Sequence, residues 1–234
     1  MISIESLRFD TSGWSVREAD EWLIVWSCGG PDVMNLVFRP CRPTLRSDLK
    51  NPDAIREDFQ REIADSPGVL VSCGVEPVAG MAGVQTIVKW RDPAPRSLAM
   101  VFLGSFLIPF ERCWYLLTIE SQEVGTTGVR EAVVSSMRPE LFPRPGETEP
   151  IQLSSMEEFF RDVKNRPVRR LASDDEEFDR LFPDHPLSRV RFCLKTFQST
   201  LELDDELGRE KTFTVGEVAP RSSTAGAGSP PVNA

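Results

Sequence analysis

The sequence has a single histidine, His185, and no pair of cysteines spaced as CxxC. The cysteines lie far apart along the chain, which excludes zinc knuckles and thioredoxin-type motifs and favours reduced, mostly buried thiols. They are Cys28, Cys41, Cys73, Cys113 and Cys193. One imidazole without a cysteine pair argues against a conventional zinc site, and the chain lacks a DxDxD loop for magnesium or calcium. We therefore expect no metal and no cofactor.

Long apolar runs and an excess of basic residues are also missing. The first residues, MISIESLRFD, lack the positive and apolar segments of a signal peptide. No apolar run approaches the roughly 18 residues that a membrane-spanning helix needs. The net charge of −9 repels nucleic-acid phosphates and anionic membrane surfaces. These absences predict a cytoplasmic, soluble protein that binds neither nucleic acid nor membrane.

One basic run stands out within this acidic chain. Lys164, Arg166, Arg169 and Arg170 precede a block of acidic residues at 174–177. We expect the two runs to neutralise each other across a turn and to form a solvated surface. The competing interpretation, a nucleic-acid contact through residues 161–170, predicts steeply salt-dependent binding.

The composition that is present is typical of a folded protein. The chain has 234 residues, 40% of them hydrophobic, with 14 phenylalanines and five tryptophans. A chain of this length buries roughly 70–75% of its unfolded surface, which is enough for a sizeable core. The aromatic content argues against disorder over most of the length.

The first 68 residues predict strands followed by a helix. Apolar runs indicate strands over residues 2–9, 21–27 and 33–40, and GGPD at 29–32 is typical of a hairpin turn. Asn51 is a suitable cap and Pro52 suits the first position of a helix. Ile55, Phe59 and Ile63 then form one stripe, so the helix is amphipathic and ends before Pro67.

Residues 69–121 change to a β pattern and predict a four-stranded meander. The runs 98–108 and 113–119 are apolar nearly throughout, which favours central strands covered on both faces. A helix starting at Thr127 or Gly128 follows, with its apolar residues on one face. Those residues are Val129, Ala132, Val133 and Met137. The predicted fold is α+β, a mainly antiparallel sheet of about six to seven strands with packed helices and a small helical C-terminal segment.

Four regions divide the chain: a sheet domain at 1–141, a linker at 142–150, a helical segment at 151–215 and a disordered tail at 216–234. The helical segment has capping boxes at Ser154–Glu157 and Ser173–Glu176. Its last helix carries a narrow apolar stripe at Leu187, Val190, Leu194, Phe197 and Leu201. This stripe needs a partner surface, either the sheet or another protein.

His185 is the obvious catalytic candidate, but its context favours a helix start. It precedes Pro186, and Asp184 can supply a capping oxygen. A catalytic base needs a nucleophile nearby, and the chain has no GxSxG turn. The glycine-bracketed turn GTTG at 125–128 lacks the lysine of a phosphate-binding loop, so we interpret it as a helix cap.

Other polar residues give weaker signals. Glu111, Glu120, Glu123 and Glu131 could supply a pair of carboxylates, but their spacing fixes no distance between them. Cys113 follows Arg112, which could lower its pKa, yet it begins an apolar strand. The candidates for an interaction or ligand site are His185, Arg189, Glu111, Arg112 and Arg130. We assign no catalytic, cofactor or metal role to any of them.

The layout of residues 1–137 suggests a family. It has the pair Gly13-Trp14 in the first hairpin, a helix after Asn51-Pro52, a four-stranded meander and a closing helix. This order resembles the superfamily of PsbP-like photosystem proteins, Ran-binding Mog proteins and bacterial DcrB-like proteins. The resemblance implies a non-enzymatic role, because these families mostly bind other proteins as adaptors, assembly factors or chaperone-like partners. It places no functional residue on this sequence, and the absent signal sequence departs from the exported and thylakoid members.

Two functions from different classes follow. The first is a cytoplasmic protein-interaction module with an unidentified protein partner and an open oligomeric state. The alternative is an enzyme of unrecognised type that uses carboxylate and arginine side chains around Glu111, Arg112 and Arg130. A deep pocket that collects two or more of these side chains would favour the enzyme, and their dispersal over the surface would remove its basis.

Overall fold

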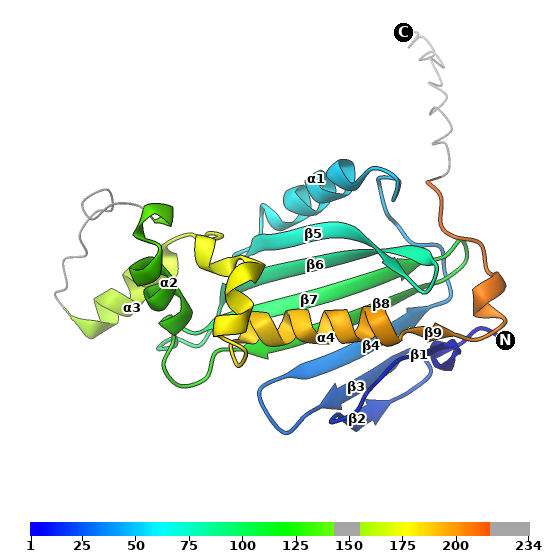
Figure 1. The fold of residues 1–234 in the computed structure, drawn as a ribbon, viewed down its shortest axis with the longest axis horizontal. Coiled ribbons are helices and arrows are strands. Elements are labelled where there is room, and N and C mark those ends of the chain that lie inside the picture. Colours follow the sequence, from blue (N-terminus) through cyan, green and yellow to red (C-terminus); the bar gives the residue numbers. More distant parts are fainter. Residues whose placement is uncertain (143–154, 216–234) are drawn as a thin grey trace, which may run out of the picture.

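Most of the molecule is a large antiparallel sheet, in which most neighbouring strands also follow one another along the chain (Figure 1). The computed structural model describes residues 1–142 and 155–215. One sheet has the order β2-β3-β4-β8-β7-β6-β5. Its strands are β2 (Ser15–Ala19), β3 (Leu23–Ser27), β4 (Val33–Arg39), β5 (Val69–Val78), β6 (Met81–Arg91), β7 (Met100–Pro109) and β8 (Trp114–Gln122). A second, two-stranded sheet joins β1 (Leu7–Arg8) to β9 (Glu202–Leu203), and the predicted α+β fold is confirmed.

The helices are short except for the last. The α-helices are α1 (Pro52–Ile63), α2 (Val129–Met137), α3 (Met156–Asn165) and α4 (Pro186–Thr200). Short 3₁₀-helices are η1 (Ile4–Ser6), η2 (Pro139–Leu141), η3 (Ala172–Asp174), η4 (Glu176–Leu181) and η5 (Leu207–Arg209). Of the helices in the described residues, none is long and apolar enough to cross a membrane.

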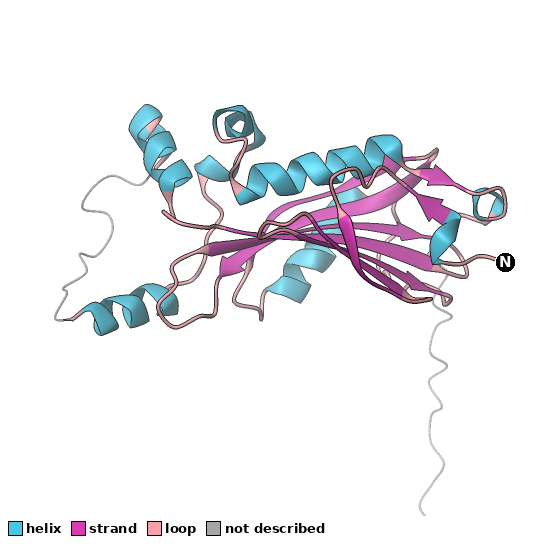
Figure 2. Ribbon diagram, turned by 90° about the horizontal axis from the view of Figure 1, so that it is seen from below, coloured by secondary structure: helices cyan, strands magenta, loops and turns pink. Residues whose placement is uncertain are grey.

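Helices cover the two faces of the large sheet unequally. The long helix α4 lies along one face, and α1 lies on the other (Figures 1 and 2). The main core lies between α4 and the strands β4, β6, β7 and β8. A smaller core lies between α1 and β5, β6 and β7, around Leu49, Ile55 and Val84. The predicted central strands, β7 and β8, do occupy the middle of the sheet.

The predicted stripe of the last helix is buried against the sheet. Leu187, Val190, Leu194 and Phe197 are almost fully buried and belong to the main core. Close contact with β7 is possible because residue 104 is glycine. A Cβ atom at Gly104 would lie 2.5 Å from Val190 Cγ1 and 2.8 Å from Leu194 Cδ1. The helical segment therefore docks on the sheet through α4.

The first predicted helix is confirmed in detail. α1 spans Pro52–Ile63, and the Asn51 side chain accepts a hydrogen bond from the amide of Ala54 at 3.2 Å. Ile55 is fully buried in the smaller core, with Phe59 packed against it. A capping asparagine, proline at the first position and a periodic apolar stripe all indicated this helix, and no tertiary contact opposes them.

Two other predictions were wrong. Of the strand expected at 2–9, only Leu7–Arg8 forms, as β1, because the Ser3 and Ser6 side chains form a capping box around η1. The edge strand of the large sheet is instead β2. The α-helix expected to begin at Ser173 is replaced by η3 and η4. There the Asp174 carboxylate accepts from the amide of Leu171 at 2.7 Å, which favours a tight turn over a helix.

The remaining predictions on organisation fall mostly outside the described residues. The linker at 142–150 lies there except for Phe142, and so do residues 151–154 and the tail at 216–234. Helix α3 begins at Met156, and its cap is Ser155, whose hydroxyl accepts from the amide of Glu158 at 3.1 Å.

Candidate functional site at the junction of β8, α2 and α4

Three of the five candidate residues meet in one place. Arg130, His185 and Arg189 line a cavity of about 470 Å³ at the end of β8. The walls come from the β8–α2 connection, the first turn of α2, and the turn between η4 and α4. The other two candidates, Glu111 and Arg112, belong to the β7–β8 turn and line a different cavity.

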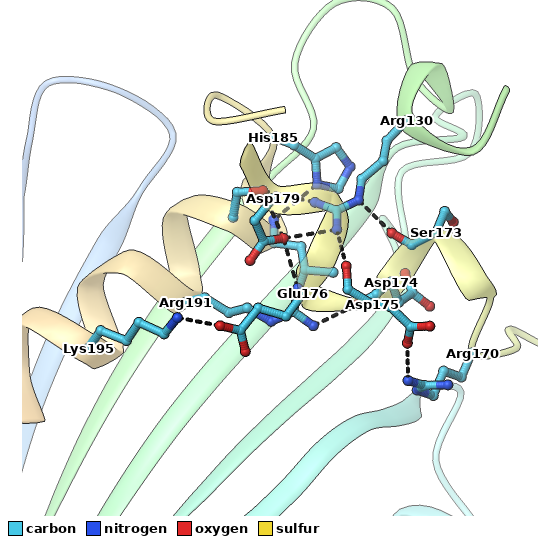
Figure 3. A network of polar contacts seen from close by, with 12 residues as sticks. Arg130, Arg170, Ser173, Asp174, Asp175, Glu176, Asp179, His185, Arg191 and Lys195 are labelled. Carbon is cyan, nitrogen blue, oxygen red and sulfur yellow. Dashed lines mark hydrogen bonds and ion pairs between the residues drawn. The ribbon is translucent and has the colours of Figure 1, made fainter. Parts of the chain in front are cut away.

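Arg130 is 1% exposed, and its guanidinium makes four hydrogen bonds (Figure 3). It donates to Ser173 O at 2.6 Å, Ser188 Oγ at 2.8 Å, Asp179 Oδ1 at 2.9 Å and Asp175 O at 3.0 Å. A planar guanidinium with several donors suits such a buried cluster of oxygens. Arg130 thus joins α2 to η3, η4 and α4, and these bonds use four of its five N–H donors.

Further buried charges extend this network beneath α4. Arg191 donates to Asp179 Oδ1 at 2.8 Å and to Asp174 O at 2.5 Å. Lys89 on β6 pairs with the Asp174 carboxylate at 2.5 Å, and both side chains are almost fully buried. Buried charges are tolerated when each is paired and hydrogen-bonded. The network ties residues 173–191 to the sheet and to α2.

Arg189 also has a structural partner. Its guanidinium donates to the two carboxylate oxygens of Asp32 at 2.8 and 3.0 Å and to Ser121 Oγ at 2.8 Å. Asp32 lies in the turn before β4 and Ser121 on β8. This bidentate pair fixes α4 across the end of the sheet.

Glu111 and Arg112 hold the C-terminal segment of the described chain, residues 210–214, at the other end of β7 and β8. Glu111 accepts from the amide and hydroxyl of Thr214 at 3.1 and 3.0 Å and pairs with Arg42 at 2.8 Å. The hydrogen bonds from Thr214, assisted by Arg42, lower the pKa of the Glu111 carboxyl. Arg112 pairs with Glu210. The enzyme hypothesis asked for a deep pocket that collects two or more of Glu111, Arg112 and Arg130. Glu111 and Arg112 do line one cavity, but both are engaged there in holding the C-terminal segment, and Arg130 lies at a different cavity.

His185 is the N-cap residue of α4, and its imidazole ring makes the capping hydrogen bond. The Leu187 amide donates to His185 Nδ1 at 3.2 Å, so the expected capping oxygen of Asp184 is not used. The ring packs edge-on against Phe102, with centroids 5.3 Å apart. Its other nitrogen, Nε2, is buried without a hydrogen-bond partner and lies 3.6 Å from Glu123 Oε1. The predicted helix start is confirmed, although its cap differs.

Two glutamates complete the surroundings of His185. Glu123 accepts from the amides of Met100 at 2.8 Å and Gly128 at 3.2 Å. Burial, the largest influence, would raise the pKa of Glu123, but His185 and these two amides together hold that pKa below its usual value. Glu131 Oε2 is buried and has no hydrogen-bond partner. The donor atoms of Glu123, Glu131 and His185 all lie within 4.8 Å of one another.

The sequence offered Glu123 and Glu131 among four glutamates that could supply a pair of carboxylates, but it did not indicate that these two lie close together. Glu123 follows β8 and Glu131 lies in the first turn of α2, where Gly128 adopts a φ of 72° and reverses the chain. That turn brings the two glutamates together, whereas Glu120 is exposed on β8. The contact with His185, from a helix 62 positions further along than Glu123, gave no local signal.

The outer surface of α2 is unexpectedly apolar. Val129, Val133 and Met137 are 45%, 39% and 55% exposed, and the buried residues of this helix are Arg130 and Val134. The expectation that Val129, Ala132, Val133 and Met137 would pack inward is wrong, because Arg130 attaches the opposite side of α2. We define the α2 patch as Val124, Val129, Val133, Met137, Leu141 and Leu181, which are all exposed.

The basic run has partners within the protein, but the acidic block at 174–177 supplies only one of them. Asp174 and Glu176 pair instead with Lys89 and Lys195. Lys164 donates to the carbonyl oxygens of Asp92 and Pro93, both at 3.2 Å. Arg166 pairs with Asp162, and Arg170 pairs with Asp175. The acidic block therefore contributes Asp175 to the neutralisation.

The cysteines are all free, and their exposure is mixed. Cys73 and Cys113 are buried, Cys193 is half-buried, and Cys28 and Cys41 are exposed. Burial raises the pKa of the Cys113 thiol to about 11, and the neighbouring Arg112 opposes this only in part. Cys113 is therefore a core residue, not an activated thiol.

Comparison with known proteins does not identify a family. No family model matches the chain, and no curated protein matches it. Among solved structures, it is similar to a crystal structure from Bacteroides thetaiotaomicron with 8% sequence identity and a TM-score of 0.33. That similarity covers 58% of this chain and 57% of the other. The resemblance to the PsbP-like superfamily stays a prediction.

Proposed function

We propose that this chain is a protein-interaction module whose partner packs on the α2 patch. The observation that carries the proposal is the outward orientation of the apolar stripe of α2. Exposed single apolar residues are ordinary, but a contiguous group of them is typical of interaction surfaces. The free cysteines suit a reducing compartment, so we place this role in the cytoplasm.

The stripe has the geometry of a helix-packing surface. Val129, Val133 and Met137 follow one another at intervals of four residues, so their side chains form one ridge along α2. Such ridges pack into the grooves of a second helix. Recognition of an amphipathic helix by an apolar surface uses this i, i+4, i+8 spacing. The partner that fits is an amphipathic helix of another protein.

Binding by addition of a partner's strand to the edge of the large sheet is less suitable, because both edge strands, β2 and β5, are protected against such pairing. β2 has a bulge between Val16 and Glu18 and all of its residues are exposed, including two charged ones. Along the other edge strand, side chains occupy three carbonyl oxygens. Arg170, Arg56 and Gln198 donate to Val71 O, Cys73 O and Pro77 O. Bulges, charges and covered edges are the usual protections against strand addition.

Charge favours a basic partner. The chain has a net charge of −9, and Glu177 and Asp184, near the α2 patch, are exposed. Opposite charge steers association and affects its rate more than its final affinity. We therefore expect basic residues beside the apolar face of the partner helix.

The test is capture from native extract, followed by reconstitution. The double variant Val133→Gln/Met137→Gln removes the ridge with a residue that favours helix. Its matched control is Phe192→Gln, which removes an exposed aromatic side chain (71% exposed) from α4. A captured protein, once purified, should bind the original chain and the control alike. Its Kd should rise at least about tenfold for the double variant, which corresponds to about 1.4 kcal/mol.

Three outcomes would contradict the proposal. Equal affinity for the three proteins would remove the α2 patch as the contact. A dimer of the chain that the double variant converts to a monomer would make a second copy the occupant. Saturable turnover of a small molecule by the purified protein would instead support the enzyme alternative.

A further inference from the structure

We infer that Glu123, Glu131 and His185 form a binding site for a divalent transition-metal ion. Their donor atoms lie within 4.8 Å of one another, and they come from the end of β8, the first turn of α2 and the N-cap of α4. The His185 side chain is only 9% exposed, and its Nε2 atom points at Glu123 without a hydrogen bond.

The two buried atoms without partners are the first argument. In the described residues, His185 Nε2 and Glu131 Oε2 belong to a short set of buried polar atoms that make no hydrogen bond. Buried polar groups are nearly always satisfied, and an unsatisfied one calls for a water molecule or an ion. Here both unsatisfied atoms belong to the same cluster, so a single bound ion satisfies both.

Charge balance is the second argument. Glu123 and Glu131 bring two carboxylates to one place, and the neighbouring arginines are already paired. Arg130 is bound to Asp179, and Arg189 is bound to Asp32. Adjacent carboxylates repel each other when no cation lies between them. A divalent cation removes that repulsion.

The geometry requires only a small contraction. Ligand atoms around a tetrahedral ion lie about 3.3–3.6 Å apart, given metal–ligand bonds of about 2.0–2.2 Å. Glu123 Oε1 and His185 Nε2 are already 3.6 Å apart. The backbone amides of Met100 and Gly128 hold Glu123 in place, and Phe102 packs against the His185 ring. Glu131 has the freedom to move, because it makes no hydrogen bond through its buried oxygen.

The ligand types select the class of ion. Imidazole suits zinc, copper, iron and nickel, and the two carboxylates also suit manganese, whereas magnesium and calcium prefer oxygen ligands alone. Glu123 and His185 also line the cavity of about 470 Å³, which gives the ion access and leaves a coordination position open to water. We therefore expect Zn²⁺ or Mn²⁺ to bind more tightly than Mg²⁺.

Metal binding has a specific consequence for the histidine. The Leu187 amide donates to Nδ1 at 3.2 Å, so the proton of the neutral ring is on Nε2 in the metal-free protein. The ion takes the place of that proton, and the ring proton moves to Nδ1. The Leu187 amide then loses its acceptor, and because Leu187 is fully buried this loss is a cost that metal binding has to exceed. Because His185 is the only histidine, its ring signals report this change directly.

The first experiment measures metal binding by calorimetry and thermal unfolding. Exposed thiols also bind zinc, so the host protein carries Cys28→Ser and Cys41→Ser. We expect one Zn²⁺ or Mn²⁺ per chain and a rise in Tm of about 5–10 °C when the free ion is near 100 times its Kd. Mg²⁺ should give a smaller rise at the same concentration.

Two variants separate ligation from folding. His185→Asn keeps a good N-cap residue but removes the imidazole, and Glu131→Gln keeps the shape but removes a charge. Each should weaken binding about 100-fold or more, and metal-free Glu131→Gln should unfold no earlier than the host protein. Glu177→Gln, an exposed acidic residue outside the cluster, is the control and should bind normally.

Nitrogen-15 NMR of the single imidazole decides the mode of binding. Zn²⁺ should shift the Nε2 signal and place the proton on Nδ1. Stoichiometric binding that survives in both ligand variants, or an Nε2 signal unchanged by saturating Zn²⁺, would overturn the inference. So would the absence of any heat or Tm change at millimolar Zn²⁺ and Mn²⁺.

Discussion

Helices α2 and α4 have similar apolar patterns in the sequence but opposite relations to the core. In α4, Leu194 and Phe197 are buried between the helix and the sheet. In α2, Val133 and Met137 are exposed, and the helix is attached through Arg130. The comparison teaches that apolar periodicity identifies a face of a helix but not what covers it.

The difference has a physical origin in the surfaces opposite each helix. α4 lies over apolar residues of β7 and β8, and Gly104 lets it approach the sheet closely. α2 instead follows the end of β8, where residues 173–188 present carbonyl, hydroxyl and carboxylate oxygens. A guanidinium satisfies such oxygens, whereas a valine would leave them unpaired. The side of α2 that carries Arg130 is therefore the buried one, and Val134 is buried with it.

Phe197→Ala should give the largest loss of stability, because it removes a fully buried aromatic ring from α4, the helix that packs on the sheet. Phe197 packs against Phe9 and Phe106, with ring centroids 4.9 and 5.5 Å apart. Loss of this ring should lower the free energy of unfolding by about 3–5 kcal/mol, measured by urea denaturation. A loss below about 1 kcal/mol would mean that α4 is not an essential part of the core.

Arg130→Met should rank second and tests how α2 is attached. Methionine has a similar length but leaves the oxygens of Ser173, Asp175 and Ser188 without their donor. Breaking a buried charge pair lowers the free energy of unfolding by about 3–5 kcal/mol. We expect a loss near the lower value, because Asp179 still forms its ion pair with Arg191. Arg130→Lys is the companion variant, since it keeps the charge but loses the planar fork. Equal stability of the Met variant and the original chain would contradict attachment by hydrogen bonds.

Much of the fold could be predicted from local patterns. The α1 helix followed from Asn51, Pro52 and the stripe of Ile55 and Phe59. The central strands β7 and β8 followed from their apolar runs. At residues 173–181 prediction failed, because the Asp174 and Asp179 carboxylates bind distant partners, Lys89 and Arg130. Such long-range contacts override a local helix signal.

The candidate site was only partly predictable. His185 was recognised as a helix start from Pro186, and the structure agrees. Its contact with Glu123 could not be foreseen, because it depends on how α4 lies across the end of β8. Arg130 was a candidate for a ligand site, but its role in attaching α2 was not foreseen, since charged residues are rarely fully buried. Burial of an arginine next to valines has no signature in a single sequence.

The smallest effect on stability is expected at Val133, and it completes the comparison. Val133→Ala shortens a side chain that is 39% exposed on α2 and outside both apolar cores. Surface substitutions of this kind change the free energy of unfolding by about 0.5 kcal/mol or less, and alanine also favours helix slightly more than valine. Val134→Ala, one residue along on the buried side of the same helix, should cost clearly more. Urea denaturation of the two variants measures both values. Equal losses would show that the Val133 side is covered within the chain itself, and the α2 patch would then no longer be available to a partner.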